Sequence, residues 1–70
     1  MSELNTGLPS VRQVQNFIKD RQEVELKLSS DDLLVGRIIW QDDHCLCLVD
    51  QYEQPTLVWH QALVYLKPKP

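Results

Sequence analysis

The sequence predicts a mainly β protein in which one N-terminal helix precedes a strongly bent, five-stranded antiparallel sheet, forming a small open barrel. Two observations lead to this prediction. Apolar residues recur at helical spacing only before residue 21, and beyond residue 23 the pattern changes to short apolar or alternating runs. There are five of these runs, and tight polar turns separate them, which is typical of strands that pair with their neighbours.

The helix is expected at about residues 10–21, after a flexible N-terminus at residues 1–7. Ser10 and Gln13 have the spacing of a capping box, in which side chains satisfy free backbone N–H groups at a helix start. Pro9 suits the first helical turn equally well. The expected apolar face of the helix consists of Val11, Val14, Phe17 and Ile18.

The strands are expected at about residues 23–28, 33–41, 44–50, 56–60 and 62–66, within a domain at 8–67 that a tail at 68–70 follows. The first run, from Val24 to Leu28, alternates strictly between apolar and polar residues, as a half-buried strand does. Gly36 lies inside the second run, where glycine is costly unless the sheet bends sharply or another group approaches closely. His60-Gln61 is a polar pair between the last two apolar runs, and we expect a kink that presents it outward.

At 70 residues, the chain forms one small domain that would be marginally stable as a monomer. Cys45 and Cys47 point the same way along a strand with Cα atoms about 7 Å apart, which is too far for an easy disulfide. They lack the further ligands of a zinc site and are interpreted as buried small hydrophobes. Because an open barrel leaves the edges of its last two strands unpaired, we expect head-to-tail pairing between copies that closes into a ring.

The net charge of −3 argues against a general nucleic-acid binder, so any attraction to phosphate must be local. No secretory signal and no stretch long enough to cross a membrane is visible, and the cysteines are unpaired, which favours a cytoplasmic protein without membrane insertion. No nucleophile and base occur with a supporting third group. We therefore predict no enzyme activity, no cofactor and no metal site.

Several short motifs follow one another in a defined order between residues 8 and 68. They are Leu34-x-Gly36-x-Ile38, Asp42 in the next turn, Leu46-x-Leu48, Val58-Trp59-His60-Gln61-Ala62-Leu63 and a proline soon after the last strand. In this order and spacing the sequence resembles the Sm-like family, and within it the bacterial RNA chaperones of the Hfq family in their divergent cyanobacterial branch. The resemblance implies an Sm-like fold, a homohexameric ring around a central pore and a role in post-transcriptional regulation.

The resemblance also implies a proximal RNA-binding face around the pore, which takes uridine-rich RNA ends. The usual pattern has aromatic-Lys-His in the last kink and an aromatic residue at the start of the third strand. Here the kink is Trp59-His60-Gln61, the stacking position is His44, and Asp42 lies in the neighbouring turn. An imidazole stacks on a base and an amide bonds a base edge. The lysine is missing, however, and histidine is mostly neutral near pH 7, which implies weak binding of phosphate.

Two further RNA surfaces that the resemblance implies are reduced in this sequence. On the distal face, the usual tyrosine is replaced by Lys27, and Asp31 in the next turn repels phosphate, so the site that Leu34 completes is degraded. On the rim, Ile18 takes a usual arginine position. The basic residues that remain for the rim are Arg12, Lys19 and Arg21.

Two functions stay open from the sequence. The first is an Hfq-like hexamer that binds RNA weakly through its proximal face. The second is a hexameric protein-interaction module, favoured by the acidic charge, the lost lysine and Tyr52 in a lengthened loop. Two interpretations also stay open for the aromatic and imidazole groups. Trp40 and Trp59 are interpreted as core or subunit-interface residues, and His44 and His60 either bind ligand or are ordinary polar strand ends.

Overall fold

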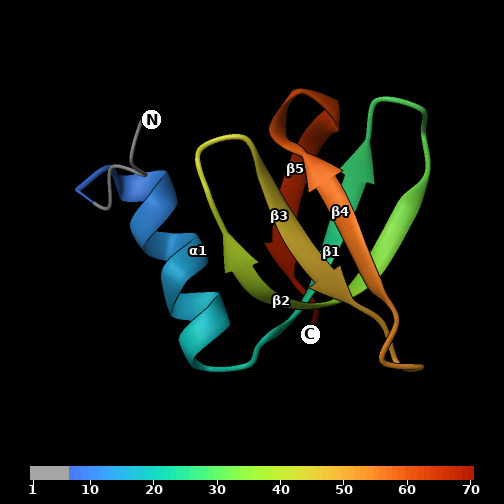
Figure 1. The fold of residues 1–70 in the computed structure, drawn as a ribbon, viewed down its shortest axis with the longest axis horizontal. Helices are drawn as coiled ribbons and strands as arrows, with labels where there is room; N and C mark the ends of the chain where they lie inside the picture. The colour runs from blue at the N-terminus through green and yellow to red at the C-terminus, as the bar shows by residue number, and fades with distance from the viewer. Residues whose placement is uncertain (1–6) are drawn as a thin grey trace.

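The computed structural model describes residues 7–70, so the expected flexible N-terminus falls almost wholly outside the described residues. Helix α1 (Pro9–Lys19) precedes five strands, and Figure 1 shows it lying beside one end of the sheet. The strands are β1 (Glu23–Leu28), β2 (Leu33–Gln41), β3 (Cys45–Val49), β4 (Pro55–Trp59) and β5 (Leu63–Pro68), with the 3-10 helix η1 (His60–Ala62) between the last two. All strand pairs are antiparallel. The predicted fold class is confirmed.

The sheet is open because its last two strands lie at opposite edges. The strand order is β4-β3-β2-β1-β5, so β4 and β5 follow each other in the chain but do not pair. Only η1, with three residues, connects them. Each of these strands therefore leaves one row of backbone N–H and C=O groups without a neighbouring strand among residues 7–70.

The sheet bends around Gly36 in β2, which Figure 1 shows curving from one side of the molecule to the other. A Cβ atom at this buried position would lie 3.0 Å from the carbonyl carbon of Val49 and 3.1 Å from Cγ of Leu48, and it would collide with the carbonyl oxygen of Val49. The end of β3 therefore packs directly on the backbone of β2. A register shift between Ile38 and Trp40 adds to the distortion, as bulges do in bent strands.

One apolar core lies inside the bend. Its buried residues are Val24, Leu26, Ile38, Leu46, Leu48 and Val58, and α1 contributes Val14, Phe17 and Ile18 from its apolar face. The side-chain amide of Gln41 in β2 donates to the carbonyl of Val11 at 3.2 Å and to the side-chain oxygen of Gln15 at 2.8 Å. These two bonds tie the start of α1 to the end of the strand on which it packs.

The start of α1 differs from the capping box that Ser10 and Gln13 predict. The N-cap is Leu8, no side chain bonds the free N–H groups there, and Pro9 lies at the first helical position. Proline suits this place because its missing N–H would be unpaired anyway. The helix ends at Lys19, two residues before the expected end, because Arg21 adopts a positive φ of 53°.

Both tryptophans are too exposed to be core residues of this domain. Trp40 is 42% exposed and Trp59 is 50% exposed in the chain, so neither belongs to the core of this domain. Their interpretation as subunit-interface residues stays a prediction. Within residues 7–70, no helix has the length and apolar character that a membrane span requires.

Replacing Gly36 by alanine should destabilise the protein by about 1–3 kcal/mol, because β3 must move away from β2 or the new Cβ is compressed. Urea unfolding at a fixed protein concentration measures the change, since assembly also affects apparent stability. Val35→Thr, at a neighbouring exposed position, is the matched control and should shift the free energy of unfolding by less than about 0.5 kcal/mol. An unchanged midpoint for Gly36→Ala would contradict the close approach of Val49.

Candidate nucleic-acid interface

Pairing of β3 with β4 brings together the two histidines predicted for the proximal face. Cys45 and Trp59 are partners in the register of this pair. One step further along, the backbone N–H of His60 donates to the carbonyl of His44 at 2.9 Å. Gln61 follows in η1 and is exposed. His44, Trp59, His60 and Gln61 therefore lie at one end of the β3–β4 pair.

Asp42 organises the turn that leads into this cluster. Its Oδ1 accepts the backbone N–H groups of His44 and Cys45, both at 2.9 Å, and its own N–H donates to the carbonyl of Cys45 at 2.9 Å. The hydrogen bonds from Cys45 and His44 hold the pKa of the Asp42 carboxyl below its ordinary value. Asp42 therefore positions His44, and its carboxylate is already occupied by donors from the chain.

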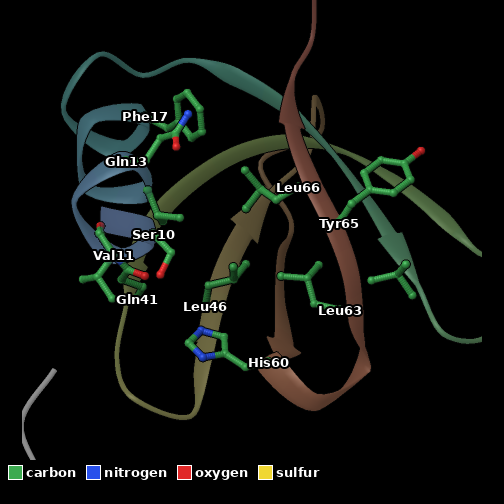
Figure 2. Close-up of a pocket in the computed structure, with 12 residues that line it drawn as sticks. Ser10, Val11, Gln13, Phe17, Gln41, Leu46, His60, Leu63, Tyr65 and Leu66 are labelled. Atoms are coloured by element: carbon green, nitrogen blue, oxygen red, sulfur yellow. The ribbon is translucent and has the colours of Figure 1, made fainter. Parts of the chain in front are cut away.

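The two histidines have different surroundings. The side chain of His44 is 77% exposed, and its Nε2 lies 3.6 Å from Oδ1 of Asp43. His60 is half-buried and lines a cavity of about 400 Å³ between α1 and β5. Figure 2 shows His60 near Leu46 and Leu63, with residues of α1 across the cavity. His44 is thus open to a ligand in solution, while His60 faces a mostly apolar hollow.

The residues predicted for the distal face do not form one open surface. Lys27 is half-buried, and its Nζ lies 3.6 Å from Oδ1 of Asp31. Leu34 is partly buried and packs against the core, so only part of its side chain is open to solvent. The turn at Asp31 has a positive φ of 72°. The lysine charge is therefore already balanced by the carboxylate of the same turn.

An aromatic residue that the sequence reasoning did not single out lies on this side of the sheet. Tyr65 in β5 is the register partner of Lys27, so the two side chains share one face. Its hydroxyl donates to Oε2 of Glu25 at 2.9 Å, which raises the pKa of the Tyr65 phenol. Nζ of Lys67 lies 5.4 Å from the ring centroid. Only the register of β5 against β1 reveals this arrangement.

The three residues predicted for the rim lie on α1 or just beyond its end. Arg12 and Lys19 are exposed on α1, and seven residues, about two helical turns, separate them, so they lie on one side. Arg21 lies just beyond α1 and lines a groove of about 510 Å³ together with Arg37 of β2. Sequence reasoning missed Arg37 because its place next to the helix end depends on how α1 packs on β2.

No group of three or more His, Cys, Asp or Glu side chains in the described part of the chain is placed to hold a metal ion. Cys45 and Cys47 are buried and carry free thiols. Burial is the main cause that raises the pKa of the Cys45 thiol, with the nearby carboxylate of Asp42 adding to it. A thiol in such surroundings is a poor nucleophile and a poor metal ligand.

Comparison with known proteins identifies one matching family model and several similar solved structures. The family model that matches is described as Hfq related, and it covers residues 8–68. An Hfq protein from Anabaena sp. has a similar structure, with 48% sequence identity, a TM-score of 0.81 and coverage of 89% of this chain and 98% of that chain. A second structure, of the pleiotropic translational regulator Hfq, is similar in fold, with 17% identity, a TM-score of 0.83 and coverage of 94% and 98%. No curated protein matches.

Replacing Asp42 by asparagine should weaken the acid sensitivity of the fold. The pKa of the Asp42 carboxyl is lower in the folded state than in the unfolded state. The ionised carboxylate therefore stabilises the fold at pH values above the unfolded-state pKa, and this stabilisation is lost as the pH falls through the folded-state pKa. Urea unfolding at a series of pH values below about 5 measures this loss. Asp20→Asn, at the C-cap of α1, is the control and should keep the wild-type pH dependence. A wild-type slope for Asp42→Asn would show that the turn does not depend on the charge.

Proposed function

The chain belongs to the Hfq-related family, and from this premise we propose that it is an RNA-binding regulator that acts as a homohexameric ring with weak affinity for RNA. The observation that carries the proposal is the cluster of His44, Trp59, His60 and Gln61 at one end of the β3–β4 pair. These are the positions that the resemblance assigns to the proximal face around the pore.

The free edges of β4 and β5 support assembly into a ring. Each edge carries exposed apolar side chains, with Leu57 49% exposed on β4 and Val64 62% exposed on β5. A free, apolar strand edge is a liability in a monomer. Pairing β4 of one copy with β5 of the next continues the sheet and uses two different surfaces, so the contact repeats until the ring closes.

The proximal cluster has groups that recognise a base but few that attract phosphate. The exposed imidazole of His44 offers a stacking surface, and the amide of Gln61 both donates and accepts hydrogen bonds. His44 contacts two carboxylates, Asp42 through its backbone N–H and Asp43 through its ring, and no lysine or arginine belongs to the cluster. Since phosphate neutralisation supplies most of the affinity of such proteins, uridine-rich RNA should bind weakly here.

The other two surfaces add little to this affinity. Arg12, Lys19 and Arg21 form a rim that can guide the RNA backbone by charge alone. On the distal side, Lys27 is paired with Asp31 and Lys67 with Glu25, so carboxylates of the chain already balance both lysine charges. The base-contacting cluster, rather than the distal face, is therefore proposed as the main RNA site.

One observation favours a second candidate, a hexameric module that acts mainly through a protein partner. Tyr52 is 74% exposed at the tip of the loop between β3 and β4. The side chain of Asp50 holds this loop by accepting the backbone N–H groups of Tyr52 at 2.8 Å and of Gln54 at 3.1 Å. An exposed aromatic side chain on a held loop, repeated around a ring, would bind a flexible partner through avidity.

Replacing His60 by lysine should strengthen binding of uridine-rich RNA by at least about tenfold at low salt, because it adds one positive charge per subunit beside the base site. Fluorescence anisotropy with labelled uridine-rich and adenine-rich oligonucleotides, at two salt concentrations, measures the affinity and its salt slope. His44→Ala with Gln61→Ala should remove the wild-type binding of the uridine-rich oligonucleotide. Tyr52→Ala, far from the cluster, is the control.

The same titration separates the two candidate functions. Weak, salt-sensitive binding that depends on His44 and Gln61 supports the RNA regulator. Submicromolar binding by the wild type would overturn the proposed weak affinity. Wild-type binding that is undetectable even at low salt would overturn RNA binding as the main activity and leave the protein-interaction module.

Light scattering should give a mass of six subunits for a chain of 8.2 kDa. Leu57→Lys should shift the ring to smaller species, because it places a charge on the proposed edge contact of β4 at a position that is exposed in the single chain. Tyr52→Lys adds the same charge on the neighbouring loop and should keep the wild-type mass. A wild-type monomer, or an unchanged mass for Leu57→Lys, would contradict the edge-paired ring.

A further inference from the structure

We propose that the groove between the end of α1 and the loop after β3 binds the RNA backbone through Arg21 and Arg37, and that Glu53 restricts this binding by occupying Arg37. The inference rests on the proposed RNA-binding function and adds a second basic residue, a regulating carboxylate and an apolar floor to the rim. Arg37 and Glu53 belong to neither the proximal cluster nor the predicted rim set.

The groove is built from three separate parts of the chain. It has a volume of about 510 Å³, and Arg21, Arg37 and Glu53 are its charged residues. Its floor is formed by apolar side chains of the helix and of β2 and β3: Ile18, Ile38, Ile39 and Val49. Ile39 is 50% exposed, so part of this floor is open to solvent. Two arginines and an apolar lining suit a nucleotide, because its phosphate is anionic and the flat faces of its base pack on apolar or guanidinium surfaces.

Arg21 is held at the edge of the groove by the end of α1. Its backbone N–H donates to the carbonyl of Ile18 at 3.2 Å, and the N–H of Gln22 donates to the carbonyl of Phe17 at 3.0 Å. These bonds fix the positive φ of Arg21. No carboxylate among residues 7–70 forms an ion pair with its guanidinium. The backbone of Arg21 is therefore held in place, and its guanidinium has no ion-pair partner in the described part of the chain.

Arg37 of β2 also lines the groove, and its guanidinium is already engaged. Its Nη2 lies 3.2 Å from Oε1 of Glu53, in a single hydrogen bond of the ion pair. A guanidinium has five N–H donors, and carboxylate and phosphate oxygens are equivalent acceptors for it. The carboxylate of Glu53 therefore occupies the place that a phosphate oxygen would take on Arg37.

The position of Glu53 is determined by its loop. Glu53 has a positive φ of 62°, its N–H donates to the carbonyl of Asp50 at 3.0 Å, and Asp50 also holds both neighbouring N–H groups through its side chain. The pair with Arg37 is nevertheless open to solvent, with side-chain exposures of 43% for Arg37 and 75% for Glu53. Exposed pairs contribute little free energy, so an RNA phosphate displaces Glu53 at a modest loss of affinity.

The test removes the carboxylate without changing the size of the side chain. Glu53→Gln should bind an unstructured, mixed-sequence single-stranded RNA about two- to fivefold more tightly at low salt, because Arg37 is released from its ion pair. The slope of log affinity against log salt should steepen by about 0.7 for each added phosphate contact. Arg37→Gln and Arg21→Gln should each weaken binding and flatten this slope.

Glu25→Gln is the matched control, because it removes the same charge from an ion pair with Lys67 outside the groove. It should leave the affinity near the wild-type value. The double variant Arg37→Gln/Glu53→Gln should bind like Arg37→Gln alone, since Glu53 is proposed to act only through Arg37. Circular dichroism and light scattering show that each variant is folded and assembled.

The inference is overturned if Glu53→Gln binds no more tightly than Glu25→Gln, or if the double variant keeps the tighter binding. Its failure is distinguishable from failure of the proposed function. Wild-type binding that depends on His44 and Gln61, without any effect of Glu53→Gln, rejects only the groove. Absence of binding by both the wild type and Glu53→Gln rejects both. If an acidic peptide of equal charge displaces the RNA as well as an oligonucleotide does, the groove is assigned to a protein partner instead.

Discussion

The packing of the end of β3 on the backbone of Gly36 is the constraint on which the other features depend. Because no side chain separates the two strands at this point, β2 bends across the molecule and carries β1 and β5 away from β3 and β4. The bend encloses the core and leaves the sheet open. It also brings Val49 and Arg37, partners in the β2–β3 register, beside the end of α1, where the basic groove forms.

The candidate RNA sites differ in how their charges are arranged. At the proximal cluster the carboxylate of Asp42 holds the turn, and the groups proposed to contact a base include no lysine or arginine. At the groove the cations are present, but one of them is paired with a carboxylate of the same chain. The proximal cluster thus has groups that suit a base but no cation for a phosphate. The groove has cations for a phosphate, but a carboxylate occupies one of them. The net charge of −3 is consistent with RNA binding that is weak and confined to local sites.

Features that depend on residues close together in the sequence could be predicted from it. Features that depend on how distant strands align with one another could not. The apolar face of α1, the bend at Gly36 and the open sheet with one helix follow from local pattern, and the structure has them. The capping box failed because Pro9 begins the helix one residue earlier and needs no side-chain partner. Leu34, assigned to the distal face by resemblance, is partly buried against the core, and its role in binding stays a prediction. The pairing of Tyr65 with Lys27 and of Arg37 with Glu53 depends on tertiary contacts between residues that are far apart in the sequence.

The connection between β4 and β5 has a consequence for how binding and assembly influence each other. Only the three residues of η1 lie between the two edge strands, and His60 and Gln61 are two of them. In the proposed ring, the backbone that presents these side chains is held at both ends by neighbouring copies. Ligand binding and subunit association then become thermodynamically linked, because whatever favours the assembled state also favours the bound state. Dilution would lower the affinity for RNA, and a bound oligonucleotide would make the ring resist dissociation.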